Sequence, residues 1–324
     1  MNYLEKRDIA AADITRLSSF NTGPVTPLAT ELSITGLQPA ALEKNITDIS
    51  GEHAGRVGVS ARSLDGRHEI NLEADGVYPT ASSIKIFVLY TLLVEADRQR
   101  ISLAERVELT DDVLKPGSGV LFHLDAGLKP TLRDLATLMM MISDNSAMIF
   151  LSQYLGLDTI NREIDRLGLA QTWLGDWCRF DTEYANSMKF GTATPREFTD
   201  FLLRMQRGEL LEPASTELFW DVLRIQKYIL PLRRHLPVSP WSREFGFAES
   251  AWVASKGGLL DDCASESGLV RVHDGGWAIS VMIAETPGIE HRAEMGEDLI
   301  SNISLAIYYS WAPLYFTGET NDRN

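Results

Sequence analysis

Polar and apolar residues follow different patterns along the chain, and each pattern predicts a different kind of element. Residues 56–62 alternate as a strand does, a turn at Asp65-Gly66 follows, and residues 68–72 alternate again, which predicts a β-hairpin. Apolar residues at helical spacing dominate the middle of the chain. The predicted helices cover residues 39–49, 131–141, 147–155, 158–167, 195–207, 215–226 and 293–311, and further strands are predicted at 252–256, 268–273 and 277–285. Thr131-Leu132-Arg133-Asp134 predicts a capping box at the start of the second helix.

Strands near both ends of the chain, with helices between them, predict a two-lobed fold with one α/β lobe and one all-α lobe. The expected α/β lobe combines residues 38–81 with 240–324 and contains an antiparallel sheet of about five strands, flanked by helices. The expected all-α lobe, residues 82–239, is inserted between these two segments. Residues 1–37 have mixed polarity and no readable motif, so we expect an N-terminal extension.

One predicted helix of the middle region begins near Ser82 and is apolar on almost every side after Lys85. Such a helix is expected to be buried. Burial of a lysine is costly unless the ammonium is paired or loses its proton, and burial lowers the pKa. A neutral Lys85 one helical turn after Ser82 can take the hydroxyl proton and make Ser82 a nucleophile. The alternative is a lysine that reaches the surface beside an ordinary serine.

Two further polar groups interrupt apolar surroundings. Ser143-Asp144-Asn145 stands between two apolar helical stretches, and Lys256-Gly257-Gly258 is expected at the end of a strand. Each group also has a purely structural interpretation, because Ser-Asp-Asn is common in loops and Lys-Gly-Gly can simply end a strand. In this order, and together with Ser82 and Lys85, the groups favour a catalytic site.

These three motifs resemble those of the class A β-lactamases and their relatives among the penicillin-recognising serine hydrolases. The resemblance extends from about residue 40 to about residue 312. It implies that Ser82 is acylated by the substrate and that Lys85 is its proton partner. It also implies that Ser143 relays a proton to the leaving group.

The same resemblance implies a set of substrate contacts. Asn145 would hydrogen-bond an amide of the substrate, and Lys256 would add positive charge near the substrate carboxylate. The backbone N–H groups of Ser82 and Leu259 would form the oxyanion hole, with Gly258 also contacting the substrate. Asp144 is expected to be structural, with its carboxylate accepting hydrogen bonds from backbone amides.

The first departure from the family pattern lies in the loop that carries the family's deacylating glutamate. If Asn186 matches the family's asparagine, Thr182 occupies the glutamate position, and Glu183 is one residue out of phase. Either Glu183 or Asp181 still reaches the water, or neither does. The resemblance therefore does not imply efficient hydrolysis of β-lactams.

The second departure is Gly257, which stands where the family has a hydroxyl that helps to hold the β-lactam carboxylate. Ser255 is expected on the opposite strand face from Lys256, so it cannot simply replace that hydroxyl. Ser267 on the next strand is the candidate replacement. Weaker recognition of a carboxylate would suit a different ester or amide substrate.

Composition and charge limit the kinds of molecule that this protein is expected to bind. The net charge of −15 disfavours nucleic acids and anionic membranes, and no apolar run has transmembrane length. The six histidines form no ligand pair, so we expect no metal and no other cofactor, and a small-molecule substrate as the partner. No secretory signal is readable at the N-terminus, and Cys178 and Cys263 are expected to be reduced thiols, which predicts a cytoplasmic protein.

Two functions remain open on these grounds. The first is a serine hydrolase that acts through a Ser82 acyl-enzyme on an amide or ester, such as a β-lactam ring or a similar small molecule. The alternative is a slowly deacylating penicillin-binding or acyl-transfer protein, or an acylated sensor. The lifetime of an acyl adduct separates the two.

Overall fold

The computed structural model describes residues 39–177, 187–227, 231–239, 241–242, 244–246, 249–285 and 292–315. The predicted N-terminal extension, residues 1–37, lies outside the described residues. So do Glu183 and the other residues of segment 178–186.

A five-stranded antiparallel sheet forms the centre of the α/β lobe, with the strand order β2-β1-β8-β7-β6. The hairpin predicted near the N-terminal end is confirmed, and so is the sheet of five strands drawn from both ends of the chain. The strands are β1 (Arg56–Ser63), β2 (Glu69–Leu72), β6 (Ala251–Leu260), β7 (Cys263–Val272) and β8 (Gly275–Ala284).

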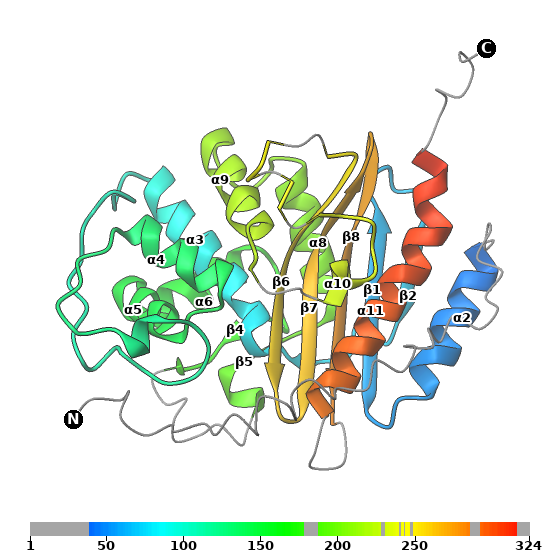
Figure 1. Cartoon of the computed structure of the whole chain (residues 1–324), viewed down its shortest axis with the longest axis horizontal. Coiled ribbons are helices and arrows are strands. Elements are labelled where there is room, and N and C mark those ends of the chain that lie inside the picture. The colour runs from blue at the N-terminus through cyan, green and yellow to red at the C-terminus, as the bar shows by residue number, and fades with distance from the viewer. Residues whose placement is uncertain are drawn as a thin grey trace, which may run out of the picture. The chain divides into compact units, whose positions relative to one another are not determined.

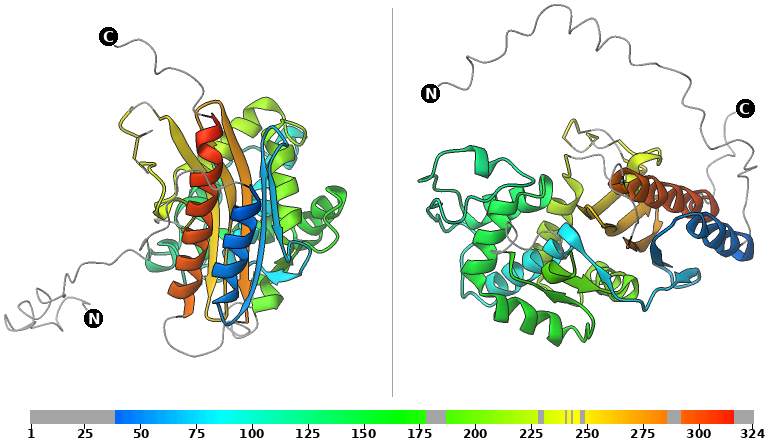
Figure 2. Two further views of the ribbon diagram at one scale, coloured as in Figure 1. Left: turned by 90° about the vertical axis from the view of Figure 1, so that its right-hand side faces the viewer. Right: turned by 90° about the horizontal axis from the view of Figure 1, so that it is seen from below.

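Helices cover both faces of this sheet, because side chains on β1, β7 and β8 are apolar on both sides. On one face, α2 (Pro39–Gly51) and α11 (Arg292–Trp311) pack side by side, as Figures 1 and 2 show. Leu42 and Ile303 from these helices are completely buried there. On the other face, α8 (Pro195–Gln206) packs against β1 and β8, and a second helix, α9 (Pro213–Arg224), packs against β6.

The all-α lobe surrounds α3 (Lys85–Asp97), whose first eleven residues are all buried, as the sequence predicts. The other helices of the lobe are α4 (Leu132–Met141), α5 (Asn145–Leu155), α6 (Leu157–Arg166) and α9 (Pro213–Arg224), and the short α10 (Pro231–Arg234) follows. A small sheet, with the order β3-β5-β4, contains β3 (Tyr78–Pro79), β5 (Gly191–Ala193) and β4 (Trp173–Leu174). The predicted capping box at the start of α4 is present, with reciprocal hydrogen bonds between Thr131 and Asp134.

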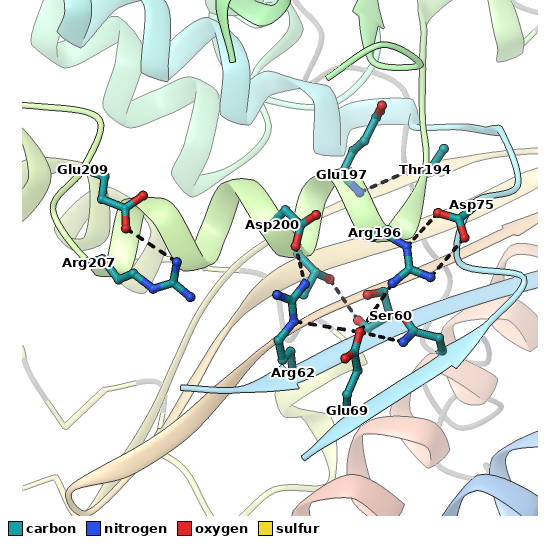
Figure 3. A network of polar contacts seen from close by, with 12 residues as sticks. Ser60, Arg62, Glu69, Asp75, Thr194, Arg196, Glu197, Asp200, Arg207 and Glu209 are labelled. Atoms are coloured by element: carbon teal, nitrogen blue, oxygen red, sulfur yellow. Dashed lines mark hydrogen bonds and ion pairs between the residues drawn. The ribbon is translucent and has the colours of Figure 1, made fainter. Parts of the chain in front are cut away.

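A network of charged side chains attaches α8 to the sheet, as Figure 3 shows. Arg196 donates hydrogen bonds of 2.7 and 3.0 Å to the two carboxylate oxygens of Asp75, and lies 3.4 Å from Glu69. Arg62 of β1 pairs with Asp200 of α8. Beneath these ion pairs, the buried Thr199 hydroxyl donates to the carbonyl of Ser60 at 3.0 Å. The network fixes the position of α8 on β1 and β2.

One local prediction about the site elements is wrong. Lys256-Gly257-Gly258 does not end a strand, because β6 continues to Leu260 and pairs with β7 along its whole length. Glycine is unfavourable in a strand, but here Gly257 and Gly258 keep their ladder partners Glu266 and Ser265.

Candidate active site

Ser82 lies in a single 3-10 turn, Ala81–Ile84, between β3 and α3. Ala81 has a φ of 43°, a left-handed conformation that costs a non-glycine residue about 1 kcal/mol. This kink reverses the chain after β3, and Ser82 then lines a cleft with a volume of about 490 Å³. Within the described part of the chain, the Ser82 hydroxyl makes no hydrogen bond, so its oxygen is available to a ligand in the cleft.

Strand β6 approaches the Ser82 backbone closely at Gly258. A Cβ atom at Gly258 would lie 2.4 Å from the amide nitrogen of Ser82 and 2.6 Å from the carbonyl oxygen of Thr80. Only glycine fits at this position. The next residue, Leu259, also lines the cleft, so the strand brings its backbone alongside the backbone of Ser82.

Lys85 begins α3 and is fully buried. Its ammonium donates hydrogen bonds to the carbonyl oxygen of Ser143 at 2.6 Å, to the Ser143 hydroxyl at 3.1 Å and to Oδ1 of Asn145 at 2.9 Å. It also lies 5.0 Å above the ring of Trp177, a cation–π arrangement. These contacts fix the position of the Lys85 amine one turn after Ser82.

Burial and the neighbouring positive charge of Lys256 hold the pKa of Lys85 well below the usual value, and the carboxylate of Asp144 opposes this only in part. Both causes favour the neutral amine. A neutral amine has one lone pair and two N–H donors, so it can accept a proton while it keeps two of its three hydrogen bonds. Lys85 therefore has the properties of a general base.

Ser143 connects the two lysines. Its hydroxyl oxygen accepts hydrogen bonds from Lys85 at 3.1 Å and from Lys256 at 3.0 Å. Both lone pairs of the oxygen are then occupied, and its own O–H remains free to donate into the cleft, which Ser143 lines. The arrangement suits a proton relay between Lys85 and a group bound in the cleft.

Asp144 is the N-cap of α5 and organises the loop in front of that helix. Its Oδ1 accepts from the amide of Ala147 at 3.0 Å, and its Oδ2 accepts from the amides of Val120 at 2.7 Å and Leu121 at 3.0 Å. Gly119 must be a glycine, because a Cβ atom there would lie 2.2 Å from Oδ2 of Asp144. These contacts agree with the structural part that the sequence predicted for Asp144.

Lys256 projects from β6 toward the same hydroxyl of Ser143 and is also fully buried. Its Nζ additionally donates to the carbonyl oxygen of Gly257 at 2.5 Å. Burial lowers the pKa of Lys256 to about 7, while the carboxylate of Glu266 acts in the opposite direction. The ammonium of Lys256 therefore loses its proton far more easily than a surface lysine does.

Glu266 lies behind Lys256, on the opposite face of the sheet, and is completely buried. It accepts hydrogen bonds from the Ser255 hydroxyl at 2.6 Å and from the amide of Leu232 at 2.8 Å. Burial raises the pKa of Glu266 to about 7, against the lowering effect of these hydrogen bonds and of the charges on Arg233 and Lys256. Glu266 was not among the residues predicted from the sequence, although a lone acid within the apolar and small residues of β7 is a signal of a buried carboxyl group.

The structure brings most of the sequence-predicted site residues to one place. Ser82, Ser143, Lys256, Gly258 and Leu259 line the cleft, and Lys85 and Asn145 lie directly behind Ser143. Glu183 lies outside the described residues.

Ser267 does not reach the cleft, so the prediction that it replaces the missing hydroxyl of Gly257 is wrong. The register places Ser267 opposite Lys256, where it is completely buried and hydrogen-bonded to the hydroxyl of Ser280 at 2.7 Å. Ser265, two residues earlier and nearer the turn, lines the cleft instead. Ser118 also lines the cleft and was missed; its hydroxyl donates to the carbonyl of Ser143 at 2.7 Å.

Other kinds of site have less support. In the described ranges, no group of three or more histidine, cysteine, aspartate or glutamate side chains is arranged to hold a metal ion. Cys263 is a free and buried thiol whose pKa is raised by burial, whereas Cys178 lies outside the described residues. None of the helices that the structure describes is long and apolar enough to cross a bilayer.

Known proteins resemble this chain in sequence and in fold. A β-lactamase from Streptomyces cellulosae is 26% identical over 239 residues, which is 72% of this chain and 76% of that protein. Among solved structures, a β-lactamase from Sphaerobacter thermophilus superposes with a TM-score of 0.74 at 24% identity, over 86% of this chain and 98% of that one. PBP-A superposes with a TM-score of 0.71 at 23% identity, over 84% and 96% of the two chains.

These solved structures share the two-lobed fold. The family model described as the beta-lactamase enzyme family matches residues 41–311, which include every residue of the cleft. The chain therefore belongs to the beta-lactamase enzyme family and is a hydrolase of the serine β-lactamase type.

Proposed function

We propose that this protein hydrolyses an amide or an ester of a small molecule through an acyl-enzyme on Ser82. The observation that carries the proposal is the buried pair of lysines that share the hydroxyl of Ser143. Lys85 lies one turn after Ser82, whose hydroxyl lines the cleft and makes no hydrogen bond to the described residues. Burial of two lysines costs free energy even when their hydrogen bonds are made, so a purely structural purpose is disfavoured. Their shared position in the cleft supports a catalytic purpose.

In the proposed acylation step, the neutral amine of Lys85 takes the proton of Ser82 as Oγ attacks the carbonyl carbon of the substrate. The negative charge on the carbonyl oxygen is stabilised by the backbone N–H groups of Ser82 and Leu259. The leaving nitrogen or oxygen then takes the proton of the Ser143 hydroxyl. Lys85 returns a proton to Ser143 along their 3.1 Å hydrogen bond, so the amine is neutral again.

The proposed second step is attack of water on the acyl-enzyme, which releases the acid and restores Ser82. Glu183 and Asp181 stay the sequence-based candidates for activating this water. If neither acts, the acyl-enzyme persists. The protein is then the alternative that the sequence left open, a slowly deacylating penicillin-binding or acyl-transfer protein. Gly257 favours an ester or amide other than a β-lactam as the substrate, because its position lacks the hydroxyl that would hold the β-lactam carboxylate.

The test mixes the purified full-length chain with a chromogenic cephalosporin and with a fluorescent penicillin, and follows both turnover and the mass of the protein. Turnover with a short-lived adduct supports the hydrolase. A stable adduct mapped to Ser82, without turnover, supports the slowly deacylating alternative.

Two matched variants make this test decisive. Ser82→Ala removes the nucleophile and should abolish both the adduct and turnover. Ser102→Ala changes an exposed serine in a turn outside the cleft and should leave both unchanged. The proposal fails if the protein neither forms an adduct nor hydrolyses β-lactams or simple activated esters, or if Ser82→Ala retains the wild-type rates.

A further inference from the structure

The cleft continues around the edge of the sheet, beyond the residues used in the proposed reaction. Strand β6 is the edge strand, and successive side chains along it point to opposite faces. Ser82, Ser143 and Lys256 line the cleft on the face toward the all-α lobe. Ala264 and Ile300 line it on the face toward α11. One continuous cleft therefore has two halves, which meet at Gly257.

The second half is open because small residues meet at its centre. Gly257 has no side chain between the two halves, and Ala264 opposite Leu259 carries only a methyl group. Helix α11 approaches Ala264 closely through Gly296, where a Cβ atom would lie 2.9 Å from the Ala264 Cβ. This approach brings Glu297 and Ile300 of α11 to the cleft.

The walls of this second half are apolar with one acidic group. Pro231, Ala264 and Ile300 supply the apolar surface, and Glu297 supplies a carboxylate whose side chain is 28% exposed. Oε2 of Glu297 accepts a hydrogen bond from Arg234 at 2.6 Å, and the same guanidinium lies 2.9 Å from Asp298.

The charges near this carboxylate favour a cation over an anion. Two carboxylates share the single guanidinium of Arg234, which leaves one net negative charge on this cluster at neutral pH. Lys256, the cation that lines the other half of the cleft, donates to Ser143 and to the carbonyl of Gly257 instead. A carboxylate bound here would lie near Glu297, and none of the described lining residues would offer it a free cation. An apolar stem ending in a cation would match both the walls and the charge.

We propose that this half of the cleft, formed by Gly257, Ala264, Pro231, Ile300 and Glu297, is a specificity subsite for a substrate substituent with an apolar stem and a cationic end. The cation lies against the carboxylate of Glu297. This inference rests on the proposed acyl-enzyme function and names the class of substrate: amides or esters that carry an amine or quaternary ammonium group.

The test uses nitrophenyl esters with acyl chains of matched length that end in trimethylammonium, tert-butyl or carboxylate. A second series places the same three groups on the alcohol side of a simple ester. For the wild-type protein, kcat/KM should be about fivefold higher for the cationic member than for the tert-butyl member in at least one series, the range of a partly exposed ion pair. The carboxylate member should be the poorest substrate, and added salt should reduce the differences.

Two variants with the same change of charge locate the effect. Glu297→Gln should abolish the preference for the cation while retaining hydrolysis of the tert-butyl ester. The side chain of Asp298, the other partner of Arg234, is 70% exposed and does not line the cleft. Asp298→Asn should therefore change the preference for the cationic ester less than twofold. Equal rates for all members in both series, a preference for the carboxylate, or a preference that survives Glu297→Gln would overturn the subsite. If the wild-type protein hydrolyses none of the esters, the proposed function itself is contradicted. Failure of the subsite and failure of the proposed function can therefore be told apart.

Discussion

Two clusters of positively charged side chains in this protein, one buried and one partly exposed, behave in opposite ways. At the cleft, Lys85 and Lys256 are fully buried and share one neutral hydroxyl. On the outer side of α8, Arg62 and Arg196 are partly exposed, and each faces a carboxylate (Figure 3). Burial moves the pKa values of the lysines down, whereas the carboxylate of Asp75 moves the pKa of Arg196 up.

The difference shows that solvent access decides what a charged side chain does. At the surface, an ion pair positions one element on another, and water and salt screen its free energy. In the interior, a lysine side chain without a carboxylate partner has a lowered pKa. More of it is then neutral at physiological pH and able to accept a proton. The buried lysines can therefore take part in proton transfer, but their burial lowers the stability of the fold. The partly exposed ion pairs position α8 on the sheet with little effect on stability.

The largest expected effect comes from removing the buried base. Lys85→Met should slow formation of the acyl adduct on Ser82 by about a thousandfold, within the range of general-base catalysis. The same change should leave thermal stability equal or higher, because the cost of desolvating a buried amine is removed and an apolar side chain of similar length replaces it. Stopped-flow acylation and calorimetry measure the two effects. A large fall in Tm together with unchanged acylation would show that Lys85 is structural.

The pH dependence of stability separates the two buried groups of opposite sign. Folding raises the pKa of Glu266 from 4.5 to about 7, so the folded state holds the extra proton, and the stability from Glu266 is lost as pH rises through this interval. Folding lowers the pKa of Lys256 from 10.5 to about 7, so the unfolded state holds the extra proton, and stability rises with pH between 7 and 10.5. These two groups together should give a minimum near pH 7.

Denaturant titrations of three proteins across this pH range provide the measurement. The difference in the free energy of unfolding between wild type and Glu266→Gln should decline as pH rises from 4.5 to 7. The difference in the free energy of unfolding between wild type and Lys256→Met should instead shift in favour of the wild type as pH rises from 7 to 10.5. Parallel curves for all three proteins would mean that neither group changes its pKa on folding.

The smallest effect is expected at the surface. Arg196→Met breaks the ion pairs to Asp75 and Glu69 but leaves the buried hydrogen bond of Thr199 intact. It should lower Tm by no more than about 2 °C at low salt and less at high salt, with no change in acylation. A loss as large as that of a core substitution would place the network among the main determinants of stability.

The sequence by itself determined most of the helices, the sheet of five strands drawn from both ends of the chain, and the family. Periodicity was sufficient because the helices and strands of this protein carry strong patterns and clear caps, as at Thr131 and Asp134. The sequence also selected Ser82, Lys85, Ser143 and Lys256 as polar residues in apolar surroundings, and the structure brings them together. Their catalytic roles and the cytoplasmic location stay predictions.

Only the tertiary structure decided which side chains share the cleft. The register between β6 and β7 places Ser265 in the cleft and Ser267 in the core, a difference of two residues that the pattern of the strand cannot resolve. The packing of α11 on Ala264 brings Glu297 to the cleft that Gly257 also lines, although the two residues are far apart in the sequence. Periodicity reports which face a residue occupies, but the neighbours across that face come from other elements. Their identity is fixed when those elements pack.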